Sequence, residues 1–138
     1  MAGLIKGIQV VEATPAVNDI QAAVSHEGIC VWRVNLSGVT SKTGLLDAIV
    51  KALSFPDYYS RNWDSLEECL RDFNQGKGWL VVFDQADNLL ALPRQDLATL
   101  ESILPDTAHF WSTEGRIFGA LFVGSSSLNN ALSLAPVR

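Results

Sequence analysis

The fold is decided by the stretch GWLVVFDQAD, residues 78–87, in which an apolar run gives way to polar side chains. A short apolar run rich in β-branched and aromatic residues is typical of a strand buried on both faces of a sheet. Two other stretches have the same character, ICVWRVNL at residues 29–36 and RIFGALFVG at residues 116–124. The sequence therefore predicts three strands.

Helical patterns separate these strands. Apolar residues recur at helical spacing over residues 45–53, and Pro56 ends that helix because the residue before a proline disfavours the α conformation. Asn62 is a suitable N-cap for a second helix. Residues 94–111 predict a third, which Pro105 breaks or kinks. The expected fold class is α/β, a small three-stranded parallel sheet with right-handed helical crossovers.

The length of 138 residues favours a single domain spanning residues 1–138. We divide it into an N-terminal extension at residues 1–28, a core at 29–124 and a polar tail at 125–138. Within the extension, residues 18–27 predict a short helix. The segment before that helix is expected to form either a short strand or a loosely attached arm.

Composition narrows the range of partners. The net charge is −5 and the ten basic residues are scattered, which disfavours a nucleic-acid backbone and favours a basic partner. No apolar run approaches the length of a membrane span, and the N-terminus lacks the pattern of a signal peptide. We therefore expect a cytoplasmic protein that binds neither nucleic acid nor membrane.

The cysteines and histidines give little support for catalysis or metal binding. Cys30 and Cys69 are too few for a disulfide scaffold, so both thiols are expected to be reduced and packed. His26 and His109 lack metal-ligand spacing, so no metal or cofactor is expected. A Cys69–His109 nucleophile pair is a possible alternative, but burial beside an apolar helical stripe would make this thiol inert.

Two polar runs follow predicted strands, at residues 35–41 and 84–88. In parallel α/β sheets, ligands and partners usually bind outside the carboxyl ends of the strands. Both runs are therefore candidate edges of a binding site.

The stretch FPDYYSRNWDSLEECLRDF, residues 55–73, carries a second candidate site. Asp64, Glu68 and Asp72 follow one another at intervals of four and share one side of the predicted helix, with Glu67 adjacent. Like charges at this spacing cost about 0.2–0.5 kcal/mol per pair. The face is either a solvated surface or an interface for a basic partner.

Two consecutive tyrosines, Tyr58 and Tyr59, precede this helix. Two neighbouring rings cannot easily enter the same core, so at least one should be exposed. Tyrosine is enriched at binding hot spots, although one ring could pack under the loop while the other lies idle on the surface.

The run PDYYSRNWDSLEECL, which begins at Pro56, resembles the signature segment of the barstar family, intracellular inhibitors of secreted bacterial ribonucleases. In that family a Pro-acid-Tyr-Tyr-Gly turn leads into an Asn-x-Asp-x-Leu-x-acid-Cys-Leu helix. The order of predicted strands and helices over residues 29–124 is similar as well. The resemblance implies a barstar-like fold, and residues 1–28 resemble the extension of longer members.

The resemblance also implies a function: a non-enzymatic inhibitor that covers the cationic active site of a basic, extracellular-type ribonuclease or nuclease toxin. A carboxylate, Glu68, would stand in for an RNA phosphate. The alternative is a non-catalytic interaction or regulatory module that binds another basic partner. The partner-binding residues implied by the family are Tyr58, Tyr59, Ser60, Asn62, Asp64, Glu67 and Glu68.

The chain departs from the family pattern at several of these positions. Glu68 is one methylene longer than the usual Asp, Ser60 replaces a Gly, and Glu67 stands where the family commonly has Trp. The acidic contact of the family's last helix has no match, since residues 109–111 are His-Phe-Trp.

Overall fold

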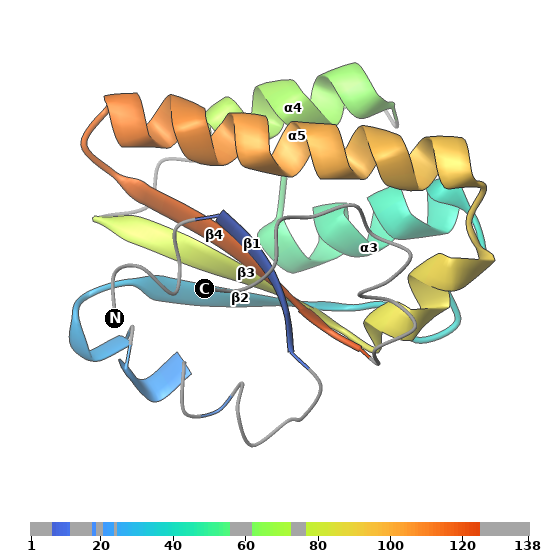
Figure 1. Cartoon of the computed structure of the whole chain (residues 1–138), viewed down its shortest axis with the longest axis horizontal. Coiled ribbons are helices and arrows are strands. Elements are labelled where there is room, and N and C mark those ends of the chain that lie inside the picture. The colour runs from blue at the N-terminus through green and yellow to red at the C-terminus, as the bar shows by residue number, and fades with distance from the viewer. Residues whose placement is uncertain are drawn as a thin grey trace.

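The computed structural model describes residues 7–11, 18, 21–23, 25–55, 62–72 and 77–124. Its centre is a four-stranded sheet in which every neighbouring pair of strands is parallel (Figure 1). The strand order is β1-β4-β3-β2. The strands are β1 Gly7–Val11, β2 Cys30–Asn35, β3 Gly78–Asp84 and β4 Ile117–Val123.

The predicted α/β class, the three core strands and their parallel pairing are confirmed, but the sheet has a fourth strand. β1 comes from the N-terminal extension and pairs with β4, with Gly7 opposite Gly119 and Val11 opposite Val123. Without β1, one side of β4 would present unpaired amides and carbonyls, which are costly at a buried edge. The short-strand alternative for this segment is therefore the correct one.

Helices α3, α4 and α5 lie on one face of the sheet (Figure 1). α3 packs on β2, α5 packs on β4 and β1, and α4 packs on α5. A short 3-10 helix, η1, overlaps the polar run that follows β3. α5 runs without interruption through Pro105, so the break considered for that position does not occur. The bounds are α3 Lys42–Leu53, α4 Trp63–Asp72, η1 Ala86–Ala91 and α5 Arg94–Thr113.

Local hydrogen bonds define where α3 and α4 begin. The Ser41 hydroxyl accepts a hydrogen bond from the amide of Gly44 at 3.1 Å. The Asn62 side chain accepts one from the amide of Ser65 at 2.8 Å, which confirms the predicted N-cap. α3 ends at Ser54, whose left-handed backbone (φ 54°) directs its amide to the carbonyl of Val50. Pro56 lies outside the described residues.

The core has one layer on each face of the sheet. On the helical face, Phe83 and Phe122 stack with centroids 4.8 Å apart, and Trp79 meets the edge of Trp111 at 4.7 Å. A smaller cluster occupies the opposite face, and its members are Ile29, Leu80, Val82 and Leu121. The central strands β3 and β4 are therefore buried on both faces, as the apolar runs predicted.

β2 departs from that prediction because it is an edge strand. Its burial pattern leaves Cys30 and Arg33 exposed, whereas Val34 is fully buried. The expectation that the Cys30 thiol is packed is therefore wrong, while Cys69 is buried as expected. Apolar composition revealed the strand but not its place at the end of the sheet.

Arg33 connects three parts of the chain. Its Nε donates to Asp84 Oδ2 at 2.8 Å, and its Nη1 donates to Gln21 Oε1 at 3.2 Å. The hydrogen bonds to Asp84 raise the pKa of the Arg33 guanidinium, desolvation lowers it, and the charge of Asp84 raises it again. The N-terminal extension thus contacts the core both here and through β1.

Gly78 offers a test of the packing between β3 and β4. A Cβ at this position would lie 2.5 Å from the carbonyl oxygen of Ile117, closer than two such atoms can approach. Gly78→Ala should therefore lower the free energy of unfolding by about 1–3 kcal/mol, the usual cost of overpacking. Urea unfolding followed by circular dichroism measures the change.

Gly44→Ala is the matched control. Its Cβ would meet only ordinary contacts, the nearest at 3.5 Å, and the position is helical. Alanine should stabilise this helix by about 0.5–1 kcal/mol relative to glycine. Equal effects of the two substitutions would show that the close approach at Gly78 does not constrain the sheet.

Candidate functional site

α4 is held against α5 by a narrow apolar stripe. Leu66, Cys69 and Leu70 form that stripe, and each is at most 3% exposed. The indole Nε1 of Trp111, on α5, donates a hydrogen bond to the carbonyl of Leu70 at 3.0 Å. These contacts fix which side of α4 faces the protein and which side faces solvent.

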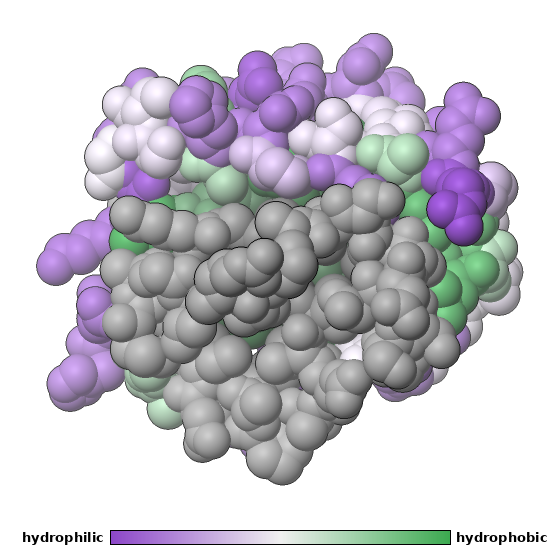
Figure 2. Space-filling view, in the orientation of Figure 1, coloured by the Kyte–Doolittle hydropathy of each residue, from purple (hydrophilic) through white to green (hydrophobic). Residues whose placement is uncertain are grey.

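The side of α4 that carries the acids is open to solvent. Asp64, Glu68 and Asp72 are exposed and Glu67 is half-buried. We call these four residues the acidic face. The upper edge of the molecule, formed by α4 and α5, is mainly hydrophilic (Figure 2). The structure therefore presents the carboxylates predicted to share one side of the helix.

Nearby cations neutralise only part of the acidic face. Arg71 Nη2 lies 3.7 Å from Glu67 Oε2, and the Arg71 guanidinium stacks 5.4 Å from the ring centre of Phe110. Among the described residues, no lysine or arginine forms an ion pair with Asp64 or Glu68. These two carboxylates are accessible to the cations of a partner.

The start of the helix has a second fixed cation. Lys42 Nζ lies 5.7 Å from the ring centre of Trp63, and this attraction connects α3 to the first residue of α4. Asn62 uses its side-chain oxygen as the N-cap, and its side-chain nitrogen can still donate to a partner.

The predicted loop contacts Tyr58, Tyr59 and Ser60 lie outside the described residues. The residues on either side of the loop are described. Phe55 packs against the main core, and Asn62 begins α4.

The catalytic alternative gains no support from the geometry. Cys69 is buried in the α4 stripe, while His109 is exposed on α5. A thiol packed in this way is a structural side chain, not a nucleophile. Across the described residues, no cluster of three or more His, Cys, Asp or Glu side chains could hold a metal ion.

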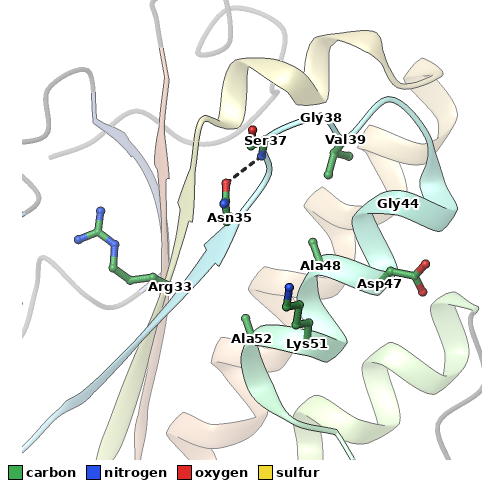
Figure 3. Close-up of a pocket in the computed structure, with 10 residues that line it drawn as sticks. All are labelled: Arg33, Asn35, Ser37, Gly38, Val39, Gly44, Asp47, Ala48, Lys51 and Ala52. Carbon is green, nitrogen blue, oxygen red and sulfur yellow. Dashed lines mark hydrogen bonds between the residues drawn. The ribbon is translucent and has the colours of Figure 1, made fainter.

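A hollow of about 660 Å³ lies between β2 and α3, at the first polar run predicted as a binding edge (Figure 3). The turn after β2 closes one end of it. The α3 residues that line it were not singled out from the sequence, although three small residues at intervals of four were a visible signal. The lining residues are Arg33, Asn35, Ser37, Gly38, Val39, Gly44, Asp47, Ala48, Lys51 and Ala52.

Comparison with protein families gives one match. The model of the family described as "Barstar (barnase inhibitor)" matches residues 29–123, from the start of β2 to the end of β4. No curated protein sequence matches the chain.

Solved structures with a similar fold include two proteins titled Cdc6p and ORC2. Cdc6p from Pyrobaculum aerophilum aligns with a TM-score of 0.59 at 17% identity, covering 92% of this chain and 34% of that one. The ORC2 protein of Aeropyrum pernix, solved in ADPNP and ADP complexes, gives 0.56 at 18% identity, covering 92% and 39%. This chain spans just over a third of their length, and the likeness is one of fold alone.

The described residues include no helix that is both long and apolar enough to span a bilayer.

Trp111→Phe should test how α4 is held. The change keeps most of the ring contact but removes the donor to the carbonyl of Leu70, and an unsatisfied buried polar group costs about 1–3 kcal/mol. We expect that loss in the free energy of unfolding and faster hydrogen exchange of the α4 amides. Ser112→Ala, which removes an exposed hydrogen bond on the same helix, is the control. Unchanged exchange in α4 would contradict the anchoring role of Trp111.

Proposed function

Because the chain belongs to the barstar (barnase inhibitor) family, we propose that it inhibits a basic ribonuclease by covering the enzyme's active site with α4 and the preceding loop. The observation that carries this proposal is the exposure of Asp64 and Glu68, with neither engaged in an ion pair among the described residues. Such carboxylates are suited to cations that normally hold an RNA phosphate.

The binding mode follows from charge and shape. A ribonuclease cleft must be cationic to bind the RNA backbone, so an acidic helix is drawn to it over long range. Glu68 lies midway between Asp64 and Asp72 on the acidic face and would enter the phosphate position. The partner-binding residues we propose are Tyr58, Tyr59, Ser60, Asn62, Asp64, Glu67 and Glu68.

The contributions of these residues should differ. The nearby Arg71 guanidinium neutralises part of the Glu67 charge. Glu67 should therefore attract an incoming cation less strongly than Glu68 does. Tyr58 and Tyr59 would supply rigid aromatic contact area around the charged centre. Glu68, longer by one methylene than the usual family Asp, would select a target whose phosphate site is slightly deeper.

On this proposal the chain acts by occupancy, without catalysis and without a cofactor. An inhibitor of this kind would work in the cytoplasm, where it protects the cell from a basic nuclease before export or after entry. That role is of the antitoxin or immunity type.

Glu68→Ala is the most direct test of the binding mode. Removing one member of a buried charge pair leaves the partner's cations unpaired and costs about 2–5 kcal/mol, a range known in part from barstar-family complexes themselves. With barnase as the first enzyme of a panel of basic ribonucleases, we expect a large loss of affinity through faster dissociation. Stopped-flow association and displacement kinetics measure both rates.

Asp72→Ala provides the comparison, because Asp72 lies one turn further along α4 and would sit at the rim of the interface. Its effect should be severalfold at most and confined to association. Thermal unfolding of both variants checks that α4 remains folded. If the two substitutions weaken binding equally, Glu68 is not the phosphate mimic.

The association rate should fall steeply as salt is raised. Exposed charges steer the encounter and are screened beyond about 8–10 Å at physiological ionic strength. Measuring the rate constant from low to high sodium chloride tests this, with dissociation expected to change much less. An association rate independent of salt would remove the electrostatic basis of the proposal.

A further inference from the structure

Among the described residues, no strand covers the outer backbone edge of β2. In the described sheet it is the terminal strand and pairs only with β3. The backbone amide of Leu36 donates a hydrogen bond to the carbonyl of Asp84 at 3.1 Å, so the backbone groups of Leu36 face β3. Since alternate residues of a strand direct their N–H and C=O groups to opposite sides, every other residue points outward. The outward-directed residues are Val31, Arg33 and Asn35.

The hollow described above lies beside this edge. One wall carries the outward backbone groups of Arg33 and Asn35, and the other is a face of α3 (Figure 3). That face consists of Gly44, Ala48 and Ala52 at intervals of four, so no large side chain fills the space between strand and helix. The combination leaves room for another extended chain alongside β2.

Three charged residues line the groove, namely Arg33, Asp47 and Lys51. Lys51 lies on the α3 surface that borders the hollow, and no hydrogen bond or ion pair is found for its amine among the described residues. The Asp47 carboxylate points away from β2, and the Arg33 side chain turns away from α3 toward Asp84 (Figure 3). Lys51 is therefore the lining cation that remains for an occupant.

We propose that this groove binds an extended acidic peptide segment of a partner protein, which adds to β2 as a fifth strand of the sheet. In strand addition, main-chain hydrogen bonds supply affinity and alternate side chains supply specificity. Here the outward amides and carbonyls of β2 hydrogen-bond the peptide backbone. Its inward side chains are small enough to lie against Ala48, and a carboxylate pairs with Lys51.

A second copy of the chain fits this edge less well. Symmetric pairing of β2 with β2 would bring the same surface together twice, Lys51 included, and would join two molecules that each carry a net charge of −5. An acidic peptide avoids the lysine–lysine contact, because its carboxylate pairs with Lys51. The site lies on β2 and α3, so it is separate from the ribonuclease-binding helix proposed above.

Selection of random nonapeptides displayed on phage against the full chain provides the probe. We expect enriched sequences to combine β-branched residues with at least one acid. Synthetic copies of the best peptide are then titrated into the wild type and four variants. Val31→Pro removes one outward amide without touching the β3 ladder, and Ala48→Phe fills the groove. Lys51→Glu reverses the charge, and Val31→Ala is the control that keeps the amide.

The first three variants should each bind the peptide roughly tenfold more weakly or worse, and Val31→Ala about as well as the wild type. Hydrogen exchange followed by NMR gives a second readout. The amides of Val31, Arg33 and Asn35 should become protected only when the peptide is bound, whereas those of Trp32 and Val34 are protected throughout. Loss of binding in Ala48→Phe alone would support the site even if Val31→Pro failed to fold.

Three results would overturn the proposal. One is a selection that enriches no peptide. Another is a peptide that binds Ala48→Phe and Lys51→Glu as tightly as the wild type. The third is dimerisation of the free chain that Ala48→Phe abolishes, which would assign the edge to a second copy.

Discussion

The packing of α4 on α5 is the contact on which the proposed activity depends. Leu66, Cys69 and Leu70 occupy the only strongly apolar side of a ten-residue helix, and Trp111 secures it through the carbonyl of Leu70. With that side buried, the acids must face solvent. A helix this short would be marginal on its own, so packing on α5 sets its position and the direction in which its acids face.

The acidic face has a cost in stability that binding can offset. Asp64 and Glu68 repel each other at helical spacing, and among the described residues neither forms an ion pair, whereas Glu67 lies close to Arg71. Asp64 gains from the positive end of the helix dipole, whereas Glu68 is too far along the helix to benefit. A partner's cations would remove this repulsion. The groove beside β2 differs from it, because in the described part of the chain Lys51 has no ion pair and the outer edge of β2 has no neighbouring strand, so the fold offers two surfaces of different chemistry.

Much of the fold could be predicted from the sequence, because local patterns report local structure. The apolar runs identified the three core strands, and Asn62 marked the start of α4. The pairing of β1 with β4 was not determined in advance, because it joins residues more than a hundred positions apart through backbone groups that leave no side-chain signal. The exposure of Cys30 was missed for a related reason: the order of strands, which puts β2 at the edge, is set by the crossovers and not by composition. The acids of α4 were found by their spacing, whereas the groove needed the sheet edge and α3 together.

Competition with a nucleotide tests the central claim most directly, namely that the acidic face of α4 occupies the phosphate site of a ribonuclease. The affinity of the chain for barnase, or for another enzyme that it inhibits, is measured by calorimetry at increasing concentrations of a mononucleotide that binds the active site. If Glu68 takes the place of a phosphate, the apparent affinity should fall in proportion to the fraction of enzyme occupied by nucleotide. An affinity that stays constant when the enzyme is saturated with nucleotide would place the chain elsewhere on the nuclease and contradict the account.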